Sequence, residues 1–206
     1  MRTTEQQLEI GTDLRDFHLF SKPDKDGNQS AKDVFDSKIV EYLISHMDLM
    51  IYNNILYIYV GGVFVKDKDG RKIKSQIQAL MYDEFKTSIR INRVYALLMC
   101  TNSLVVTEEE TNTYPAHWIN FKNGMLDVIS GRLKGHSPAY HSMNQIPHEY
   151  VVPEREKELT FCKFLESRMG EDDRQMLYEF FALCLNMDMS FQKMMYIVGG
   201  GNAGKS

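Results

Sequence analysis

The last eight residues of the sequence have the types and spacing of a phosphate-binding loop. Gly199, four further residues and then Gly204-Lys205-Ser206 match the pattern Gly-x-x-x-x-Gly-Lys-Ser/Thr. Glycines let backbone N–H groups curl around an anion, the lysine reaches the β- and γ-phosphates, and the serine hydroxyl binds Mg²⁺. The sequence therefore predicts a nucleotide site, with Ser206 as magnesium ligand, made of Gly199, Gly200, Gly201, Asn202, Ala203, Gly204, Lys205 and Ser206.

A strand before this loop and a helix after it would have to position it. Residues 194–198 form a short apolar run typical of a buried parallel strand. The helix whose N-terminus would hold the phosphate, and a later strand with an acidic magnesium ligand, would follow Ser206. We therefore interpret residues 191–206 as the first strand and phosphate loop of a truncated α/β ATPase, and expect residues 1–206 alone neither to bind ATP and Mg²⁺ well nor to hydrolyse ATP. An incidental glycine-rich tail is the alternative.

Composition and charge are those of an ordinary globular protein. Hydrophobic residues make up 43% and charged residues 25% of the 206 positions, and the formal net charge is −4. This charge argues against a uniformly basic surface that coats nucleic acid, but it allows a local basic patch. Residues 66–93 hold eight basic and four acidic side chains, so this stretch is the candidate anion-binding region.

The cysteines and the hydropathy indicate a chain in a reducing compartment. Cys100, Cys162 and Cys184 are too few and too far apart for a disulfide framework or a CxxC zinc site. The first residues show no signal-peptide pattern, and no run of about 18 apolar residues occurs. We expect a cytoplasmic location and no membrane partner.

Hydrophobic spacing predicts an α+β fold that begins with a helix and a three-stranded meander. Residues 1–30 read as a loose polar lead, and Ser30 with Asp33 suggests a capping box for a helix over about 31–47. Strands follow at 50–52, 55–60 and 63–65, separated by two-residue turns that suit antiparallel hairpins. Alternation places Tyr57 and Tyr59 on one face of the meander. These tyrosines suit either cross-strand packing or stacking on nucleic-acid bases.

Two helices are predicted after the meander, over about 73–85 and 90–100. Basic residues lie near the ends of these helices, and they could hold nucleic-acid phosphates as in a winged-helix surface. The DNA-binding candidates are Lys72, Lys74, Arg90 and Arg93. Solvated helix faces are the alternative interpretation of the same charges.

The second half of the sequence predicts small hairpins and then a helical pair. Asn123-Gly124 marks a hairpin and Ser130-Gly131 a second turn. Helices are expected over 154–169, ending in a left-handed cap at Gly170, and over 172–187. We divide the chain into a polar lead (1–30), a module that is strand-rich over 49–150 and helical over 151–190, and the residues 191–206 described above.

Several segments together resemble a family of replication proteins. They are Ile119-Asn-Phe-Lys-Asn-Gly-Met-Leu-Asp-Val128, Gly131-Arg-Leu133, His136-Ser-Pro138, Ile146-Pro-His-Glu-Tyr150, the two following helices and the terminal loop. This arrangement resembles phage and plasmid primase–helicases related to the poxvirus primase–helicase. The resemblance covers about residues 50–206, and residues 31–190 would be the linker or collar between a primase and the motor.

The resemblance implies an ATPase of helicase superfamily 3 that forms a hexameric homo-oligomer and unwinds DNA with ATP and Mg²⁺. It places the chain in the cytoplasm, the host's if it is phage-encoded. No complete catalytic set is present in the chain, so we assign no catalytic residue. The alternative is a non-catalytic module that binds a replication initiator or loader. A small nucleotide kinase fits less well, because such enzymes usually carry the loop near the start of the chain.

Overall fold

The structure is a computed structural model, and it describes residues 13–152, 159–185 and 192–198. The described residues form an α+β fold with five α-helices and three small antiparallel sheets. They divide into two compact units. Among the described residues, unit 1 holds those up to 113 together with 137–144, and unit 2 holds 114–136 together with those from 145 onward.

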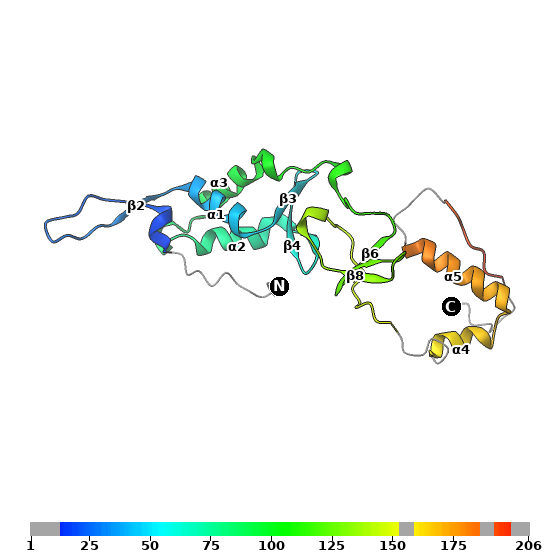
Figure 1. The fold of residues 1–206 in the computed structure, drawn as a ribbon. Coiled ribbons are helices and arrows are strands. Elements are labelled where there is room, and N and C mark those ends of the chain that lie inside the picture. Colours follow the sequence, from blue (N-terminus) through cyan, green and yellow to red (C-terminus); the bar gives the residue numbers. More distant parts are fainter. Residues whose placement is uncertain (1–12, 153–158, 186–191, 199–206) are drawn as a thin grey trace. The chain divides into compact units, whose positions relative to one another are not determined.

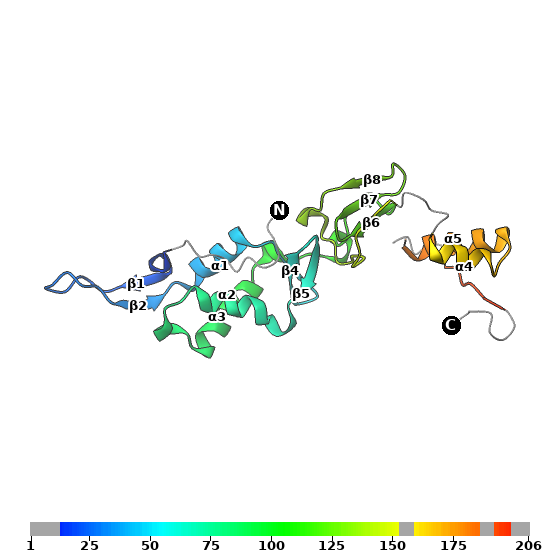
Figure 2. The same ribbon diagram turned by 90° about the horizontal axis from the view of Figure 1, so that it is seen from below.

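Unit 1 combines three helices with a hairpin and a three-stranded meander. Its elements are β1 (His18–Phe20), β2 (Ala31–Val34), α1 (Asp36–His46), β3 (Leu49–Tyr52), β4 (Ile55–Val60), β5 (Val63–Lys66), α2 (Arg71–Ala79) and α3 (Ser88–Met99). The β1–β2 hairpin projects from the unit, and α3 packs against both α1 and α2 (Figures 1 and 2).

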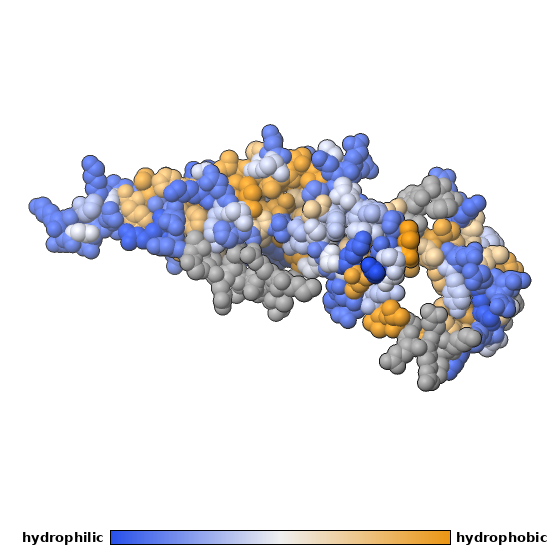
Figure 3. Space-filling view, viewed as in Figure 1, coloured by the Kyte–Doolittle hydropathy of each residue, from blue (hydrophilic) through white to orange (hydrophobic). Residues whose placement is uncertain are grey.

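One hydrophobic core joins the three helices to one face of the meander. Each helix contributes apolar residues three or four positions apart, and so presents a single apolar stripe. The almost fully buried members are Ile39, Leu43, Leu56, Ile73, Ile77, Leu80, Met81, Val94 and Leu98. Other apolar residues stay on the surface over α3 (Figure 3), where Ile89 is 81% exposed.

The predicted meander is confirmed. Asn53 and Asn54 have φ values of 50° and 59°, both in the left-handed region that a two-residue hairpin turn requires. Leu56 and Ile58 point into the core, whereas Tyr57 falls on the opposite face as the alternation predicts.

Residues 137–144, which we call the closing segment, cover part of that opposite face. The Phe64 N–H donates to the Ser142 carbonyl oxygen at 2.7 Å. Phe64 and Ser142 are only 4% and 1% exposed, and Met50 on the same face of the meander is 0% exposed. Tyr59 belongs to the same cluster, and its buried hydroxyl has no hydrogen-bond partner among the described residues. Burial is the main reason that the pKa of Tyr59 is raised to about 12.

The beginning of the chain differs from the expectation. Within the predicted loose lead, Leu14–Phe17 form a short 3-10 helix and β1 follows it, with Phe17 and His18 buried. The predicted capping box at Ser30 is wrong, because Ala31–Val34 pair with β1 as a strand and α1 begins only at Asp36. Pairing with β1 gives the backbone groups of residues 31–34 hydrogen-bond partners, whereas the first N–H groups of a helix have none within the helix.

Unit 2 contains a small sheet of β6 (Trp118–Phe121), β7 (Gly124–Asp127) and β8 (Arg132–Lys134). Both predicted turns are confirmed, although Gly124 opens β7 instead of lying in the turn. A Cβ on Gly124 would lie 2.6 Å from the Lys134 carbonyl oxygen, so only glycine allows β8 to approach this closely. The Asn123 side chain holds the backbone of Tyr150 in place. Its Nδ2 donates to the Tyr150 carbonyl oxygen and its Oδ1 accepts the Tyr150 N–H, each at 2.9 Å.

The helical pair of unit 2 consists of α4 (Thr160–Glu166) and α5 (Glu171–Leu185). The predicted left-handed cap at Gly170 is wrong, since this glycine is not among those with positive φ. Gly170 instead serves the start of α5, where its carbonyl accepts the N–H of Arg174 at 3.1 Å.

The strand expected over residues 194–198 is not formed. Met194 and Val198 are 84% and 85% exposed. A parallel strand is built by hydrogen bonds to its neighbours, and no strand among the described residues pairs with this segment.

Candidate nucleic-acid interface

A tight turn between β5 and α2 fixes the start of α2. The carboxylate of Asp67, a residue only 4% exposed, accepts the backbone N–H groups of Lys72 and Ile73, each at 2.9 Å. These are helix N-terminal groups that the helix itself cannot satisfy. Gly70 has a φ of 66°, and a Cβ there would lie 2.6 Å from a ring carbon of Tyr95 in α3. The turn therefore holds α2 closely against α3.

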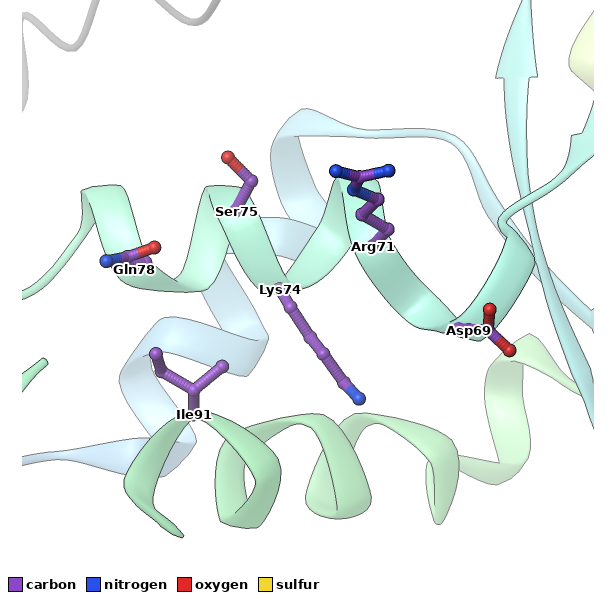
Figure 4. A pocket seen from close by; sticks show the side chains of 6 residues that line it. All are labelled: Asp69, Arg71, Lys74, Ser75, Gln78 and Ile91. Atoms are coloured by element: carbon purple, nitrogen blue, oxygen red, sulfur yellow. The ribbon is translucent and has the colours of Figure 1, made fainter. Parts of the chain in front are cut away.

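A shallow, open groove of about 490 Å³ lies along α2 on the side that faces α3 (Figure 4). It is lined by Asp69, Arg71, Lys74, Ser75, Gln78 and Ile91. Four of these residues lie at the helical spacing that places them on one side of α2. We call Arg71, Lys74, Ser75 and Gln78 the α2 flank. Each of the four side chains can donate hydrogen bonds to an anion.

The groove carries a net positive charge from its side chains. Arg71 and Lys74 outweigh the single carboxylate of Asp69. Lys74 extends from α2 toward α3 (Figure 4), and its Nζ lies 4.6 Å from the centroid of the Tyr95 ring. Burial, followed by the nearby carboxylates of Asp67 and Asp69, raises the pKa of Tyr95. This arrangement suits the phosphates of a nucleic-acid backbone, which take hydrogen bonds from such side chains.

The two candidate arginines of α3 are engaged in ion pairs. Arg90 Nη1 lies 2.6 Å from Asp33 Oδ1, and Arg93 Nε lies 2.5 Å from Asp36 Oδ2. The pKa of Asp33 is lowered, first by the Val34 N–H and then by Arg90. The Arg90 side chain is 20% exposed and that of Arg93 is 56% exposed. Arg93 therefore keeps more freedom to reach a ligand than Arg90 does.

The structure brings together only part of the predicted set. Lys74 lies in the groove, whereas the exposed Lys72 is on α2 but does not line it. Sequence reasoning missed Ser75 and Gln78. Their spacing of four residues from Arg71 and Lys74 was the signal that could have found them.

The predicted nucleotide site, Gly199 to Ser206, lies outside the described residues. The assignments of Lys205 to phosphate and of Ser206 to Mg²⁺ therefore stay predictions.

The fold and the groove define a small α+β module in which two basic side chains and one carboxylate line an open groove. Residues 25–181 match the family model described as D5 N terminal like. Because the match spans most of the chain, the chain belongs to this family, which is found in phage and viral primase–helicase proteins. The comparison with curated proteins finds no match. Among the helices in the described part of the chain, none is long and apolar enough to cross a membrane.

Proposed function

We propose that this chain is the collar module that precedes the ATPase of a phage-type replicative primase–helicase. The match over residues 25–181 carries the proposal, and the phosphate-loop pattern at residues 199–206 supports it. The motor would belong to helicase superfamily 3, similar to the poxvirus primase–helicase, and would unwind DNA as a hexameric ring with ATP. In that ring Lys205 contacts the phosphates and Ser206 binds Mg²⁺.

Within this protein, unit 1 guides DNA through the α2 flank. Arg71 and Lys74 supply positive charge, and Ser75 and Gln78 supply neutral donors beside it. Each phosphate contact releases counterions, so the logarithm of affinity falls with the logarithm of salt concentration by roughly 0.7 to 0.9 per contact.

Fluorescence anisotropy with single-stranded and forked DNA, at salt concentrations from about 50 to 200 mM, tests this role. Arg71→Ala and Lys74→Ala are expected to weaken binding and to reduce the salt slope by about one each. Lys163→Ala, which removes an exposed lysine from α4, is the matched control and should bind as wild type does. No binding by the wild type at about 50 mM salt would remove the DNA-guiding role.

The nucleotide assignment has its own test in the full primase–helicase. Lys205→Ala removes the predicted phosphate contact, so ATP hydrolysis should be lost. The affinity of unit 1 for DNA should not change, since its surface is untouched. Hydrolysis at the wild-type rate would contradict the assignment of Lys205.

The helical pair of unit 2 favours a second role, contact with protein. Phe161, Met176, Phe181 and Leu185 are 50%, 62%, 43% and 47% exposed, and clusters of exposed apolar residues mark interaction sites. Their partner would be another copy of the chain or a replication initiator. Light scattering on wild type and on Phe161→Asp with Phe181→Asp tests self-association. Ile129→Asp, at a residue that is 77% exposed on the β7–β8 turn, is the control, and a monomeric wild type would leave only the initiator.

A further inference from the structure

The outer face of the meander carries aromatic residues beside the closing segment. Tyr57 of β4 pairs in register with Lys66 of β5. Tyr52 of β3 lies on the same face, with its ring centroid 6.5 Å from that of Tyr57. We call Tyr52, Tyr57 and Lys66 the tyrosine patch. The two rings are half-buried and Lys66 is exposed.

The tyrosine patch differs from the packed cluster next to it. The Tyr59 ring lies 5.1 Å from that of Phe64, a residue 4% exposed under the closing segment. The rings of Tyr52 and Tyr57 are instead tilted by 56°, so they do not stack on each other. Neither hydroxyl makes a hydrogen bond to another described residue. The patch therefore keeps ring surface that can stack on another planar group.

Basic residues outnumber acidic ones along the chain from this patch to the groove, where Asp67 and Asp69 alternate with three cations. Exposed Lys66 ends β5, exposed Lys68 follows in the turn, and Arg71 begins α2. Aromatic rings beside a cationic track are the combination by which proteins hold single-stranded nucleic acid, since bases stack on the rings and phosphates lie on the cations.

We propose that the tyrosine patch stacks an unpaired base of single-stranded DNA while Lys66 and Lys68 hold the adjoining phosphates. Bases inside a duplex are stacked on one another, so a single strand offers Tyr57 free faces along its length whereas a duplex offers them only at its two ends. Unit 1 thereby prefers single strands over duplex. This inference rests on the proposed DNA contact of unit 1 and names the form of DNA that it takes.

Anisotropy with a thymidine oligonucleotide and with a blunt duplex of the same length tests the preference at one salt concentration. Tyr57→Leu keeps an apolar side chain but loses the ring, and should lower affinity for the single strand about tenfold with duplex affinity unchanged. Tyr57→Phe keeps the ring and should bind as wild type does. An equal loss on both DNAs, or no loss on either, would overturn the inference while the α2 flank contact stands.

A second measurement does not depend on how the leucine variant folds. A single-stranded oligonucleotide containing 2-aminopurine should lose fluorescence when wild type or Tyr57→Phe binds, because the base stacks on a ring. Binding without this quenching refutes the stacking. If the wild type binds no DNA, both the inference and the proposed DNA contact fail.

Discussion

The glycine at the start of α2 offers a sharp test of how unit 1 is packed. Gly70 has a φ of 66°, and the left-handed region costs other residues roughly 1–2 kcal/mol. A Cβ would also lie 2.6 Å from a ring carbon of Tyr95, and overpacking a buried position costs about 1–3 kcal/mol. We expect Gly70→Ala to lower the free energy of unfolding by about 2–5 kcal/mol.

A double-mutant cycle separates the two costs. In a Tyr95→Leu background the ring is gone, so Gly70→Ala should cost only the backbone part, about 1–2 kcal/mol. Urea unfolding followed by far-ultraviolet circular dichroism measures all four proteins. Gly27→Ala is the matched control, because Gly27 has a φ of 82° and no heavy atom near its Cβ position. A clash between a Cβ at position 70 and the Tyr95 ring is ruled out if Gly70→Ala costs no more than Gly27→Ala, or if removing the ring leaves the cost of Gly70→Ala unchanged.

Three further predictions concern single side chains. Asp67→Ala leaves two N–H groups of α2 without their acceptor and should cost about 2–3 kcal/mol in urea unfolding, with part of the loss recovered in Asp67→Asn. His18→Phe keeps a ring against Tyr82 but removes two hydrogen bonds of the imidazole. Nδ1 bonds the Leu14 carbonyl oxygen at 2.7 Å, and Nε2 accepts the Tyr82 N–H at 3.2 Å. Thermal unfolding should show that the free energy of unfolding falls by about 1–3 kcal/mol. The pKa of Asp127 is lowered from 3.8, first by its side-chain hydrogen bond with Ser130. The ionised Asp127 carboxylate therefore contributes its full stabilisation of the fold at pH values above 3.8. This contribution is lost as pH falls through the lower pKa that Asp127 has in the folded protein. Unfolding measured between pH 6 and pH 2 should be less acid-sensitive in Asp127→Asn, and equal sensitivity in both proteins would contradict this.

The sequence predicted those parts of the fold whose signals are local. The meander was found because Asn53-Asn54 supplies a turn and the strands alternate around it. The β1–β2 hairpin was missed because its strands pair across a connection of residues 21–30, which leaves no short-range periodicity. Ser30 and Asp33 have the types of a helix cap, but the pairing with β1 decides their conformation.

The candidate interface was predictable only in part, for a similar reason. Charge density along residues 66–93 pointed to the segment that lines the groove, and Lys74 lies in it; the DNA contact itself stays a prediction. Arg90 and Arg93 meet Asp33 and Asp36, each 57 positions away in the sequence. Contacts over such a separation depend on how α3 packs, and no spacing in the sequence reveals them.

The closing segment also bears on how the protein is made. Unit 1 is discontinuous, since residues 137–144 cover a meander that ends at Lys66. During synthesis, at roughly 5–20 residues per second, the helical core of unit 1 is complete well before the closing segment emerges from the ribosome. The Phe64 N–H therefore lacks its bond to the Ser142 carbonyl oxygen while the β6–β8 sheet is being translated. A chain shortened to end at Thr113 would lack the Ser142 carbonyl that accepts the Phe64 N–H, so we expect it to be less stable than a chain that includes residues 137–144.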